Sequence, residues 1–371
     1  PVMYGVGSNS LYTLTNFSDT IALARENGYN VWLTIQQFGS SPNFKDNIVE
    51  EIISVALQHD VDGLNIDFEN LGEQNQARFT AFMAKLYPKA KAQGLLVAVD
   101  VTRHANNRYG LSYDRGALAG VSDYLALMAY DQHWASSPVA GSTASMSWTD
   151  SAIRLLLNEV PAEKVLLGMP FYTRNWRYDD TVVATQDLVV MMEVMRLRTE
   201  PTTAGGAGTI IRNAQIGETF PCLGVVEGEL IEGETKWYMV DLNGQVGYVS
   251  GYSGYTRYIP QGEVYGGSGL SNYAIPLQAA LDIMANLDPV AGTSQFTTRA
   301  GTVVQMRNVV IEEDGASGQT KVTYVDDQNR LNEIWLEDDA SLRQRRQLME
   351  QYNLAGLAAW SLEWLDTEQQ A

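Results

Sequence analysis

Hydrophobic and polar positions alternate along residues 62–69, and this alternation predicts a β-strand. Apolar side chains fall on one face of the strand, and Asn65, Asp67 and Glu69 fall on the other. Apolar residues flank the segment and helix-like stretches lie on both sides of it in the sequence, so we expect protein to cover both faces. Two carboxylates on a buried strand face are costly unless chemistry or strong hydrogen bonds retain them. The pattern therefore makes Asp67 and Glu69 candidate functional residues, with a solvated edge strand as the alternative.

The rest of the chain alternates between helix-like and strand-like stretches at both ends. Apolar residues spaced three and four apart predict helices at 18–28, 47–59, 74–93, 149–158 and 341–352. Short apolar runs predict strands at 30–35, 62–69, 95–101, 122–130, 165–171 and 356–364. This order with short connections indicates an α/β fold with a parallel sheet, which right-handed crossovers can close into a (β/α)8 barrel.

A different pattern separates the last two of these strands. Short alternating runs predict an all-β module at 205–258, preceded by a Gly-rich flexible linker at 203–208. Asn243-Gly244 predicts a two-residue hairpin turn inside the module. The module resembles bacterial SH3-like domains, especially in Trp237-Tyr238 followed by residues 247–250. Its ends should lie close together, so we expect that the module can be deleted without unfolding the rest.

A helix at 276–286 and three further strands after the module predict a small α+β insertion. The expected domain organisation is a first barrel part at 1–204, the SH3-like insert at 205–258, the α+β insertion at 259–335, and the closing helix and strand at 336–371.

Composition narrows the expected partners. The chain of 371 residues carries a formal net charge of −19, and a phosphate backbone would be repelled, so nucleic acid is not an expected partner. No apolar run approaches the roughly 20 residues that a membrane-spanning helix needs. The single cysteine, Cys222, excludes an internal disulfide. The three histidines, His59, His104 and His133, lack the spacing of metal ligands, so we expect neither a metal nor another cofactor.

The segment Asp62-Gly63-x-x-x-Asp67-x-Glu69 resembles the active-site strand of family 18 glycoside hydrolases, the chitinase-like (β/α)8 barrels. Three further stretches follow in the order of that family. Met128-Ala129-Tyr130-Asp131 resembles its Met-x-Tyr-Asp motif, residues 168–172 match Gly-x-Pro-x-Tyr, and Trp360 stands where the family has an indole floor for the sugar. One position departs from the pattern, because Asn65 stands where most chitinases have a second Asp.

The resemblance implies a barrel with functional residues at the C-terminal ends of its strands. The family places two strands before the one at Val31. We expect these either upstream of Pro1 or, in part, in the segment Val2 to Ser8. Because the chain begins at Pro1 without a signal-like segment, we interpret it as a fragment or a processed form.

The resemblance also implies a retaining mechanism in which the 2-acetamido group of the substrate replaces the enzyme nucleophile. Glu69 would be the general acid/base, Asp67 would orient the acetamido N–H, and Tyr130 would donate to its carbonyl oxygen. Burial and the neighbouring Asp67 should raise the pKa of Glu69. The residues expected to bind or support substrate are Trp360, Asp131, Asn65 and Tyr172.

Asn65 shifts the expected substrate. A neutral amide can hydrogen-bond Asp67 but cannot share a proton with it, so we expect Asp67 to be a simpler anion than in chitinases. Residues 65–70, 130–134 and 170–174 look more like the spore-cortex and cell-wall branch of the family, which resembles N-acetylglucosaminidases acting on peptidoglycan. Peptidoglycan or another N-acetylglucosamine-containing polysaccharide is therefore the expected partner, and the expected location is extracellular, in the wall or spore envelope. The oligomeric state is not predicted.

Other interpretations stay open. A chitinase or chitooligosaccharide hydrolase is the second enzyme reading, and a spore-coat protein that retains activity is compatible with the same motifs. A catalytically silent sugar-binding protein is disfavoured, because Glu69 is present. Taken alone, Tyr130 and Trp360 are compatible with core aromatics, and Asp131 with a helix N-cap. Trp134 and Trp176 are compatible with sugar contact or with packing.

Overall fold

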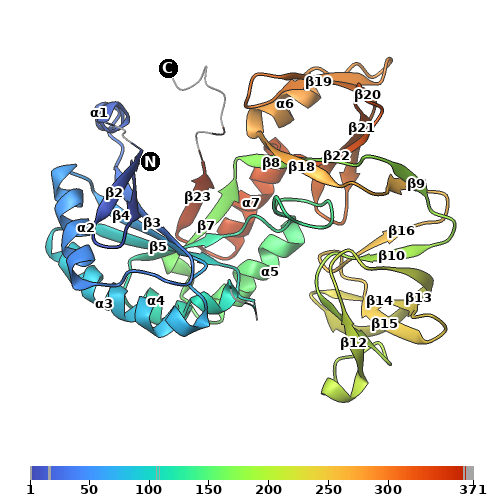
Figure 1. Cartoon of the computed structure of the whole chain (residues 1–371), viewed down its shortest axis with the longest axis horizontal. Coiled ribbons are helices and arrows are strands. Elements are labelled where there is room, and N and C mark those ends of the chain that lie inside the picture. Colours follow the sequence, from blue (N-terminus) through green and yellow to red (C-terminus); the bar gives the residue numbers. More distant parts are fainter. Residues whose placement is uncertain (1, 16–17, 106, 108, 362–363, 365–371) are drawn as a thin grey trace. The chain divides into compact units, whose positions relative to one another are not determined.

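The computed structural model describes residues 2–15, 18–105, 107, 109–361 and 364. The chain divides into two compact units. The first is drawn from 1–129, 152–169 and 346–358, and the second from 130–151, 170–345 and 359–371. Figure 1 labels the helices and strands along the chain.

An eight-stranded sheet organises the first unit, in the order β2-β1-β3-β4-β5-β6-β7-β23. Its strands are β1 (Val2–Val6), β2 (Leu11–Thr15), β3 (Trp32–Phe38), β4 (Gly63–Glu69), β5 (Leu96–Thr102), β6 (Tyr124–Met128), β7 (Val165–Pro170) and β23 (Gly356–Trp360). Neighbours from β1 to β7 run parallel, whereas β2 folds back antiparallel to β1. The six strands predicted from apolar runs are confirmed, although the last is shorter than predicted. The segment Val2 to Ser8 contributes a strand, as one of the two interpretations expected.

The predicted helices are also confirmed, with boundaries that shift by a few residues. They are α1 (Ser18–Glu26), α2 (Asp46–Gln58), α3 (Gln76–Ala92), α5 (Met146–Leu157) and α7 (Asp339–Gln351). Gly94 ends α3 as expected, since its φ of 78° is a left-handed conformation that glycine adopts readily. The short helix α4 (Arg115–Ala119) was not predicted.

The apolar face of the sheet forms the core of the first unit. Helices α2, α3 and α4 lie along one side of it (Figure 1). The strand side chains that face them are fully buried: Leu33, Ile35, Leu64, Ile66, Phe68, Val97 and Val99. Phe68 packs against Phe79 and Phe82 of α3, with ring centroids 5.5 and 5.7 Å away. Because side chains alternate across a strand, this packing directs the polar positions of β3, β4 and β5 to the other face.

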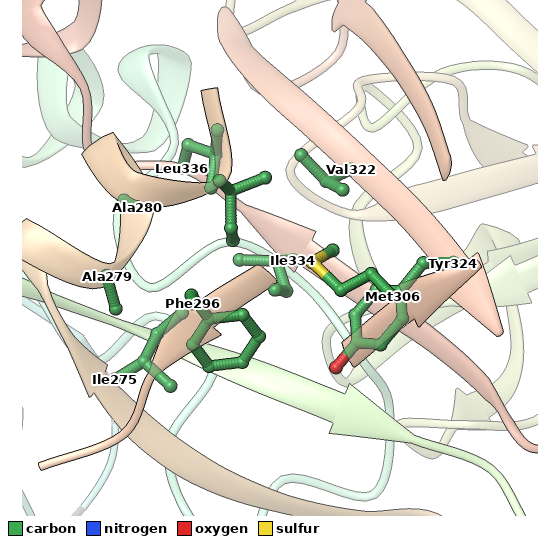
Figure 2. Close-up of a cluster of buried hydrophobic side chains, with 10 residues drawn as sticks. Ile275, Ala279, Ala280, Phe296, Met306, Val322, Tyr324, Ile334 and Leu336 are labelled. Carbon is green, nitrogen blue, oxygen red and sulfur yellow. The ribbon is translucent and has the colours of Figure 1, made fainter. Parts of the chain in front are cut away.

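The second unit contains a six-stranded antiparallel sheet, ordered β18-β8-β22-β21-β20-β19. Its strands are β8 (Tyr172–Arg177), β18 (Ser271–Pro276), β19 (Thr293–Thr297), β20 (Val303–Asp314), β21 (Gln319–Val325) and β22 (Leu331–Trp335). Helix α6 (Leu277–Ala285) packs on this sheet through Ala279, Ala280 and Ile283. Figure 2 shows the resulting core, in which Phe296, Met306 and other apolar side chains of the sheet meet the helix. The α+β part thus begins with β8, well before the predicted residue 259.

A seven-stranded antiparallel sheet forms the all-β part of the second unit, in the order β12-β11-β15-β14-β13-β10-β16. Its strands are β10 (Leu188–Met191), β11 (Met195–Arg198), β12 (Ile210–Ala214), β13 (Thr219–Ile231), β14 (Glu234–Asp241), β15 (Val246–Ser250) and β16 (Thr256–Ile259). The hairpin at Asn243-Gly244 is confirmed, because both residues have positive φ and Leu242 pairs with Gln245 around them.

The sheet begins earlier than the predicted start at residue 205, because β10 and β11 belong to it. Residues 203–208 are not a linker at its border. They lie in the connection from β11 to β12, which includes a short 3₁₀ turn at Gly206–Thr209. The Arg198 guanidinium donates to the Gly206 carbonyl oxygen, and the hydroxyls of Thr202 and Thr203 donate to the Glu229 carboxylate. The polar anchors that hold this loop were not visible in its Gly-rich composition.

A two-stranded ribbon links the two sheets of the second unit along the chain. It consists of β9 (Thr181–Val183) and β17 (Val264–Gly266), which pair antiparallel. The seven-stranded sheet follows β9 and precedes β17, and its own first and last strands pair at Leu188 and Ile259. The all-β part is therefore inserted at one point of the chain through paired strands.

Candidate active site

The register between β3, β4 and β5 places polar residues of these neighbouring strands side by side. Gln36 on β3 pairs with Asp67 on β4, and Phe38 pairs with Glu69. The β4–β5 register pairs Ile66 with Val99, so the next residues along, Asp67 and Asp100, stand at the same level. The polar face predicted from residues 62–69 is therefore confirmed, and its neighbours extend it over three strands.

Asp67 lies at the centre of this face and is almost fully buried, with 4% of its surface exposed. The Gln36 side-chain amide donates a 2.7 Å hydrogen bond to its Oδ2. Its Oδ1 is buried and has no hydrogen-bond partner within the part of the chain that the structure describes. Burial raises the pKa of Asp67 to about 6, against the opposing effect of the Gln36 hydrogen bond. Asp67 thus keeps its proton to a higher pH than an ordinary aspartate does.

Asn65 does not hold Asp67 in this structure. Its side-chain nitrogen instead donates a 2.7 Å hydrogen bond to Oδ2 of Asp100, on the neighbouring strand. Burial raises the pKa of Asp100 well above its ordinary value, and the negative charge of Asp67 raises it further. Sequence reasoning missed Asp100 and Gln36. The signal was present, because each occupies a polar position in an alternating strand segment next to β4.

Glu69 is the last residue of β4, and its side chain is half-buried. Its backbone carbonyl oxygen accepts a 2.9 Å hydrogen bond from the Gly39 amide at the end of β3. Asn70 follows with a φ of 59°, so the chain turns sharply after the strand. Glu69 therefore stands at the C-terminal edge of a parallel sheet, where α/β enzymes carry their chemistry.

Tyr113 contacts the backbone at the end of β4. It is buried, and its hydroxyl donates a 3.0 Å hydrogen bond to the Phe68 carbonyl oxygen. Burial raises its pKa well above the ordinary value, and the charges of Glu69, Asp67 and Asp100 act in the same direction. Tyr113 is therefore a neutral donor that fixes the β4 backbone between Asp67 and Glu69.

Two candidates of the second unit contact each other. The Tyr172 hydroxyl donates a 2.6 Å hydrogen bond to Oδ1 of Asp131, and the Arg174 guanidinium lies 3.9 Å from the same oxygen. Burial raises the pKa of Tyr172, and the adjacent Asp131 charge adds to this effect. Asp131 has a φ of 59° and no helix begins directly after it, so the N-cap interpretation is wrong.

The aromatic candidates differ in exposure. Tyr130 and Trp360 are half-buried, and Trp360 ends β23, where its carbonyl oxygen accepts a hydrogen bond from the Phe171 amide. Trp176 is fully buried and its indole N–H donates to the Gly141 carbonyl oxygen, so its role is packing. Trp134 remains 42% exposed, which leaves its indole face accessible.

Within the described ranges, no group of three or more His, Cys, Asp or Glu side chains is placed to hold a metal ion. No helix among these residues is both long and apolar enough to cross a membrane.

Comparison with known proteins places these residues in a family. The family model for glycosyl hydrolases family 18 matches residues 8–364. The chain is 26% identical over 152 residues to the uncharacterized glycosylase YvbX of Bacillus subtilis (strain 168), a match that covers 39% of this chain and 43% of that protein. The chain spans less than half the length of the curated relatives that it matches.

Two solved structures share the fold. A chitinase from Chromobacterium violaceum ATCC 12472 superposes with a TM-score of 0.62 at 15% identity, covering 98% of this chain and 86% of that one. The spore cortex-lytic enzyme SleL of Bacillus megaterium QM B1551 has a TM-score of 0.61 at 15% identity, covering 98% of this chain and 64% of that one. At this identity the likeness concerns the fold alone. The family match, by contrast, extends over nearly the whole sequence, and the chain therefore belongs to glycosyl hydrolase family 18.

Proposed function

We propose that this chain hydrolyses β-1,4-linked N-acetylglucosamine bonds in bacterial peptidoglycan, of the spore cortex or the cell wall, with retention and with assistance from the substrate. The observation that carries this proposal is the hydrogen bonding of the Asp67 carboxyl group. One oxygen of its carboxyl group is held by Gln36, and the other is buried without a partner among the described residues, on the strand face that ends in Glu69. A buried acceptor of this kind is costly unless a substrate group satisfies it.

The chemistry assigns different roles to the two acids. Glu69 donates a proton to the glycosidic oxygen, and the substrate's acetamido oxygen attacks the anomeric carbon. The acetamido nitrogen becomes positively charged in the resulting oxazolinium ion, and Asp67 accepts a hydrogen bond from its N–H. Glu69 then takes a proton from the water that opens this ring. The partnerless Oδ1 of Asp67 supports its assignment as the acceptor.

The other roles follow the family resemblance, and each is a separate proposal. Tyr130 donates to the acetamido oxygen, and Trp360 offers an apolar face to the pyranose ring. Asp131 and Tyr172 support substrate binding as a hydrogen-bonded pair. Asn65 acts through Asp100 rather than on the substrate.

We also propose that the eight-stranded sheet is the wall of a (β/α)8 barrel and that the seven-stranded sheet is an SH3-like module. Parallel strands in chain order, with helices between them, support the first assignment. Short antiparallel strands around a small core that includes Val189, Leu197 and Val240 support the second.

The choice of peptidoglycan rests on Asn65 and on the relatives. Asn65 replaces an acid that most chitinases carry, and the chain is 21% identical over 145 residues to a cortical fragment-lytic enzyme of Bacillus subtilis (strain 168). The cortical fragment-lytic relative also supports action outside the cell, in the wall or spore envelope. Hydrolysis of chitin oligosaccharides is the second candidate, because the chain is 27% identical over 163 residues to a class V chitinase of Arabidopsis thaliana. A silent sugar-binding role is the third candidate.

Release of reducing ends from purified cortex and vegetative peptidoglycan tests the proposal. Wild type should release them, and Glu69→Gln should lower the rate at least a hundredfold, since loss of a general acid costs about 10²–10⁴-fold. Glu73→Gln is the matched control, because Glu73 is an exposed carboxylate close by in sequence. Equal rates for wild type and Glu69→Gln would refute the mechanism. Activity confined to chitin oligosaccharides would favour the second candidate, and saccharide binding without turnover the third.

A further inference from the structure

A cavity of about 570 Å³ lies on the six-stranded sheet of the second unit. Arg177 of β8 pairs in register with Asn332 of β22, and Asn332 pairs with Tyr324 of β21, so these three side chains stand side by side on one face. All three line the cavity, together with Tyr273 of β18. The volume lies within the range of ordinary small-molecule sites, which is roughly 300–1,000 Å³.

Arg177 is the unusual residue of this cavity. Its side chain is half-buried, and its Nε–H group is buried without a hydrogen-bond partner in the described part of the chain. The ion pairs among the described residues include Arg174 with Asp131, but none of them involves Arg177. A buried donor without a partner is costly, so the Nε edge of this guanidinium lacks an acceptor that the fold does not supply.

The side-chain oxygens next to Arg177 are already engaged. Oδ1 of Asn332 accepts a 2.9 Å hydrogen bond from the Asn175 amide, and Oδ1 of Asn175 accepts one of 2.8 Å from the Tyr324 hydroxyl. The Tyr324 ring joins the buried core in Figure 2, so this wall of the cavity is fixed. Burial raises the pKa of Tyr273 and the positive charge of Arg177 opposes this rise, so the guanidinium acts on that hydroxyl as well. An acceptor for the Nε–H group has to come from solvent or from a ligand.

The charges around the cavity favour an anion. The guanidinium groups of Arg177, Arg299 and Arg330 line it, together with two carboxylates. Asp326 is bound to Arg330 at 2.8 Å, and Asp327 is exposed to solvent. The cavity thus carries more positive than negative charge, in a chain whose formal net charge is −19. A singly charged anion is compatible with this balance, whereas the rest of the chain would repel a polyanion.

We propose that this cavity binds a carboxylate, which accepts hydrogen bonds from the Nε–H and an Nη–H of Arg177 in a side-on, bidentate arrangement. The planar guanidinium matches a carboxylate in this way, and an ammonium group does not. The carrier of the carboxylate rests on the proposed function. Peptidoglycan has carboxylates on the lactyl groups of its muramic acid residues or on its peptides, whereas chitin is neutral. The site therefore favours peptidoglycan over chitin through binding, and not through the chemistry of bond cleavage.

Side-chain ¹⁵N NMR of the free protein tests the site without turnover. With arginine labelled at Nε, the Arg177 signal is identified by its absence from Arg177→Gln. N-acetylmuramic acid should shift this signal, and its neutral methyl ester should not. Muramyl dipeptide distinguishes the two carriers, since its lactyl group is amide-linked and its carboxylate lies on the peptide. A saturable shift with either acid supports the proposal, and the acid with the lower Kd identifies the carrier.

The same titration contains the results that would overturn the proposal. These are no shift with either acid, an equal shift with the methyl ester, or tighter binding of inorganic phosphate than of both acids. Arg177→Lys keeps the charge but loses the planar fork, so it should bind the acids at least about tenfold more weakly, and equal affinity would overturn the bidentate arrangement. Arg343→Gln is the matched control and should bind like wild type, because Arg343 is 71% exposed on α7 and does not line the cavity.

Sedimentation with insoluble polymers tests what the site contributes to substrate choice. The proteins carry Glu69→Gln so that the polymer stays intact. Adding Arg177→Gln should raise the Kd for peptidoglycan about tenfold and leave the Kd for chitin unchanged, because only the charged hydrogen bonds are lost. An unchanged Kd for peptidoglycan, or an equal loss on both polymers, would overturn the inference. If wild type releases no reducing ends from peptidoglycan, the proposed function fails, while the NMR titration still decides whether the cavity binds a carboxylate.

Discussion

The Gln36 side-chain amide donates a 2.7 Å hydrogen bond to Asp67, and the strand register sets the two residues directly opposite each other on β3 and β4. Gln36 thus binds one oxygen of a carboxyl group whose other oxygen is buried without a partner in the described chain. Gln36 therefore decides how Asp67 is oriented before substrate arrives.

Replacing Gln36 with Ala should lower kcat/KM roughly ten- to hundredfold, because hydrogen bonds to charged groups contribute about 1.5–3 kcal/mol. The hydrogen bond lowers the pKa of Asp67, so its loss should raise that pKa above about 6. The acid limb of the pH profile should then move to higher pH. Initial rates on a soluble muropeptide across pH 4–8 would measure both effects.

Gln37→Met is the matched control for this prediction. Gln37 is also buried on β3, but alternation directs its side chain to the opposite face. We expect Gln37→Met to change kcat/KM by less than about twofold, since the Gln37 side chain makes no hydrogen bond to Asp67. Equal losses in the two variants would show that β3 packing, and not the hydrogen bond, is what matters.

Much of the first unit could be predicted because its strands and helices repeat a simple period. The face bearing Asp67 and Glu69 follows from alternation alone, as does the burial of Leu64 and Ile66. Alternation marks Asp100 as a polar position, but its place beside Asp67 could not be predicted in the same way. It depends on the register between β4 and β5, and register is set by packing across the sheet and not by either strand alone.

Asp67 should make the protein less stable at neutral pH than at mildly acidic pH. Its folded-state pKa, about 6, lies above the ordinary 3.8, so the folded state binds the proton more tightly. Stability should therefore rise as pH falls from about 7 to about 4, and the effect of Asp67 is at most about 3 kcal/mol. Asp67→Asn should remove this contribution, so the variant should be more stable than wild type at pH 7.5 and the difference should shrink toward pH 4.

Denaturant unfolding followed at several pH values would measure this difference. The intrinsic fluorescence signal should be assigned to the first unit by comparison with Trp32→Phe, since Trp32 lies on β3. Wild type that is more stable than Asp67→Asn at pH 7.5 would contradict the prediction. It would mean that the ionised carboxylate is better satisfied than the contacts around it indicate.

Glu333 should stabilise the second unit at neutral pH and lose this effect in acid. It is 4% exposed, and its carboxylate is bound by Lys321 at 2.6 Å, Arg257 at 3.2 Å and the Tyr178 hydroxyl at 2.9 Å. Burial alone would raise the pKa of Glu333, but the two cations and their hydrogen bonds lower it to about 2. The stabilisation is thus complete above pH 4.5 and is lost as pH falls toward about 2.

Glu333→Gln should cost about 3–5 kcal/mol, because two partly buried cations lose the buried carboxylate that they share. Glu263→Gln is the matched control, since Glu263 lies 3.7 Å from the same Arg257 but its side chain is 37% exposed. An exposed pair of this kind contributes about 0–1 kcal/mol. Thermal unfolding at pH 7 and pH 3 would show whether the difference between the two variants narrows in acid, as the lowered pKa requires.

The boundaries of the all-β part were predicted less well than its hairpin. Asn243-Gly244 has a local signature, because both residues favour positive φ. The equivalent turn at Glu232-Gly233 also has positive φ at both positions. Glutamate rarely adopts positive φ, so the sequence did not predict this turn. Strands β10 and β11 have four residues each, too short for alternation to reveal, and the partners of β10 lie far along the chain.

A variant that lacks the all-β part should fold if the deletion is made at the ribbon of β9 and β17. It should not fold if the deletion follows the boundaries predicted from sequence. Val183 pairs with Val264, and the Ala184 amide donates to the Glu263 carbonyl oxygen. Replacing residues 185–262 with Asn-Gly would close this ladder with a two-residue turn that suits its twist. Deletion of 205–258 should instead leave β10 and β11 without their partners, as exposed and unpaired strands.

Soluble expression, circular dichroism and the cooperativity of unfolding would compare the two deletions. We expect the ribbon variant to unfold cooperatively, although less stably than the full chain, because Arg257 leaves with the excised sheet and Glu333 keeps only Lys321 as a cation. Adding Glu333→Gln to this variant should then cost less than it does in the full chain, since one cation instead of two loses its partner. A ribbon variant that aggregates while the 205–258 deletion stays soluble would show that the module ends where its composition changes, and not where its strands pair.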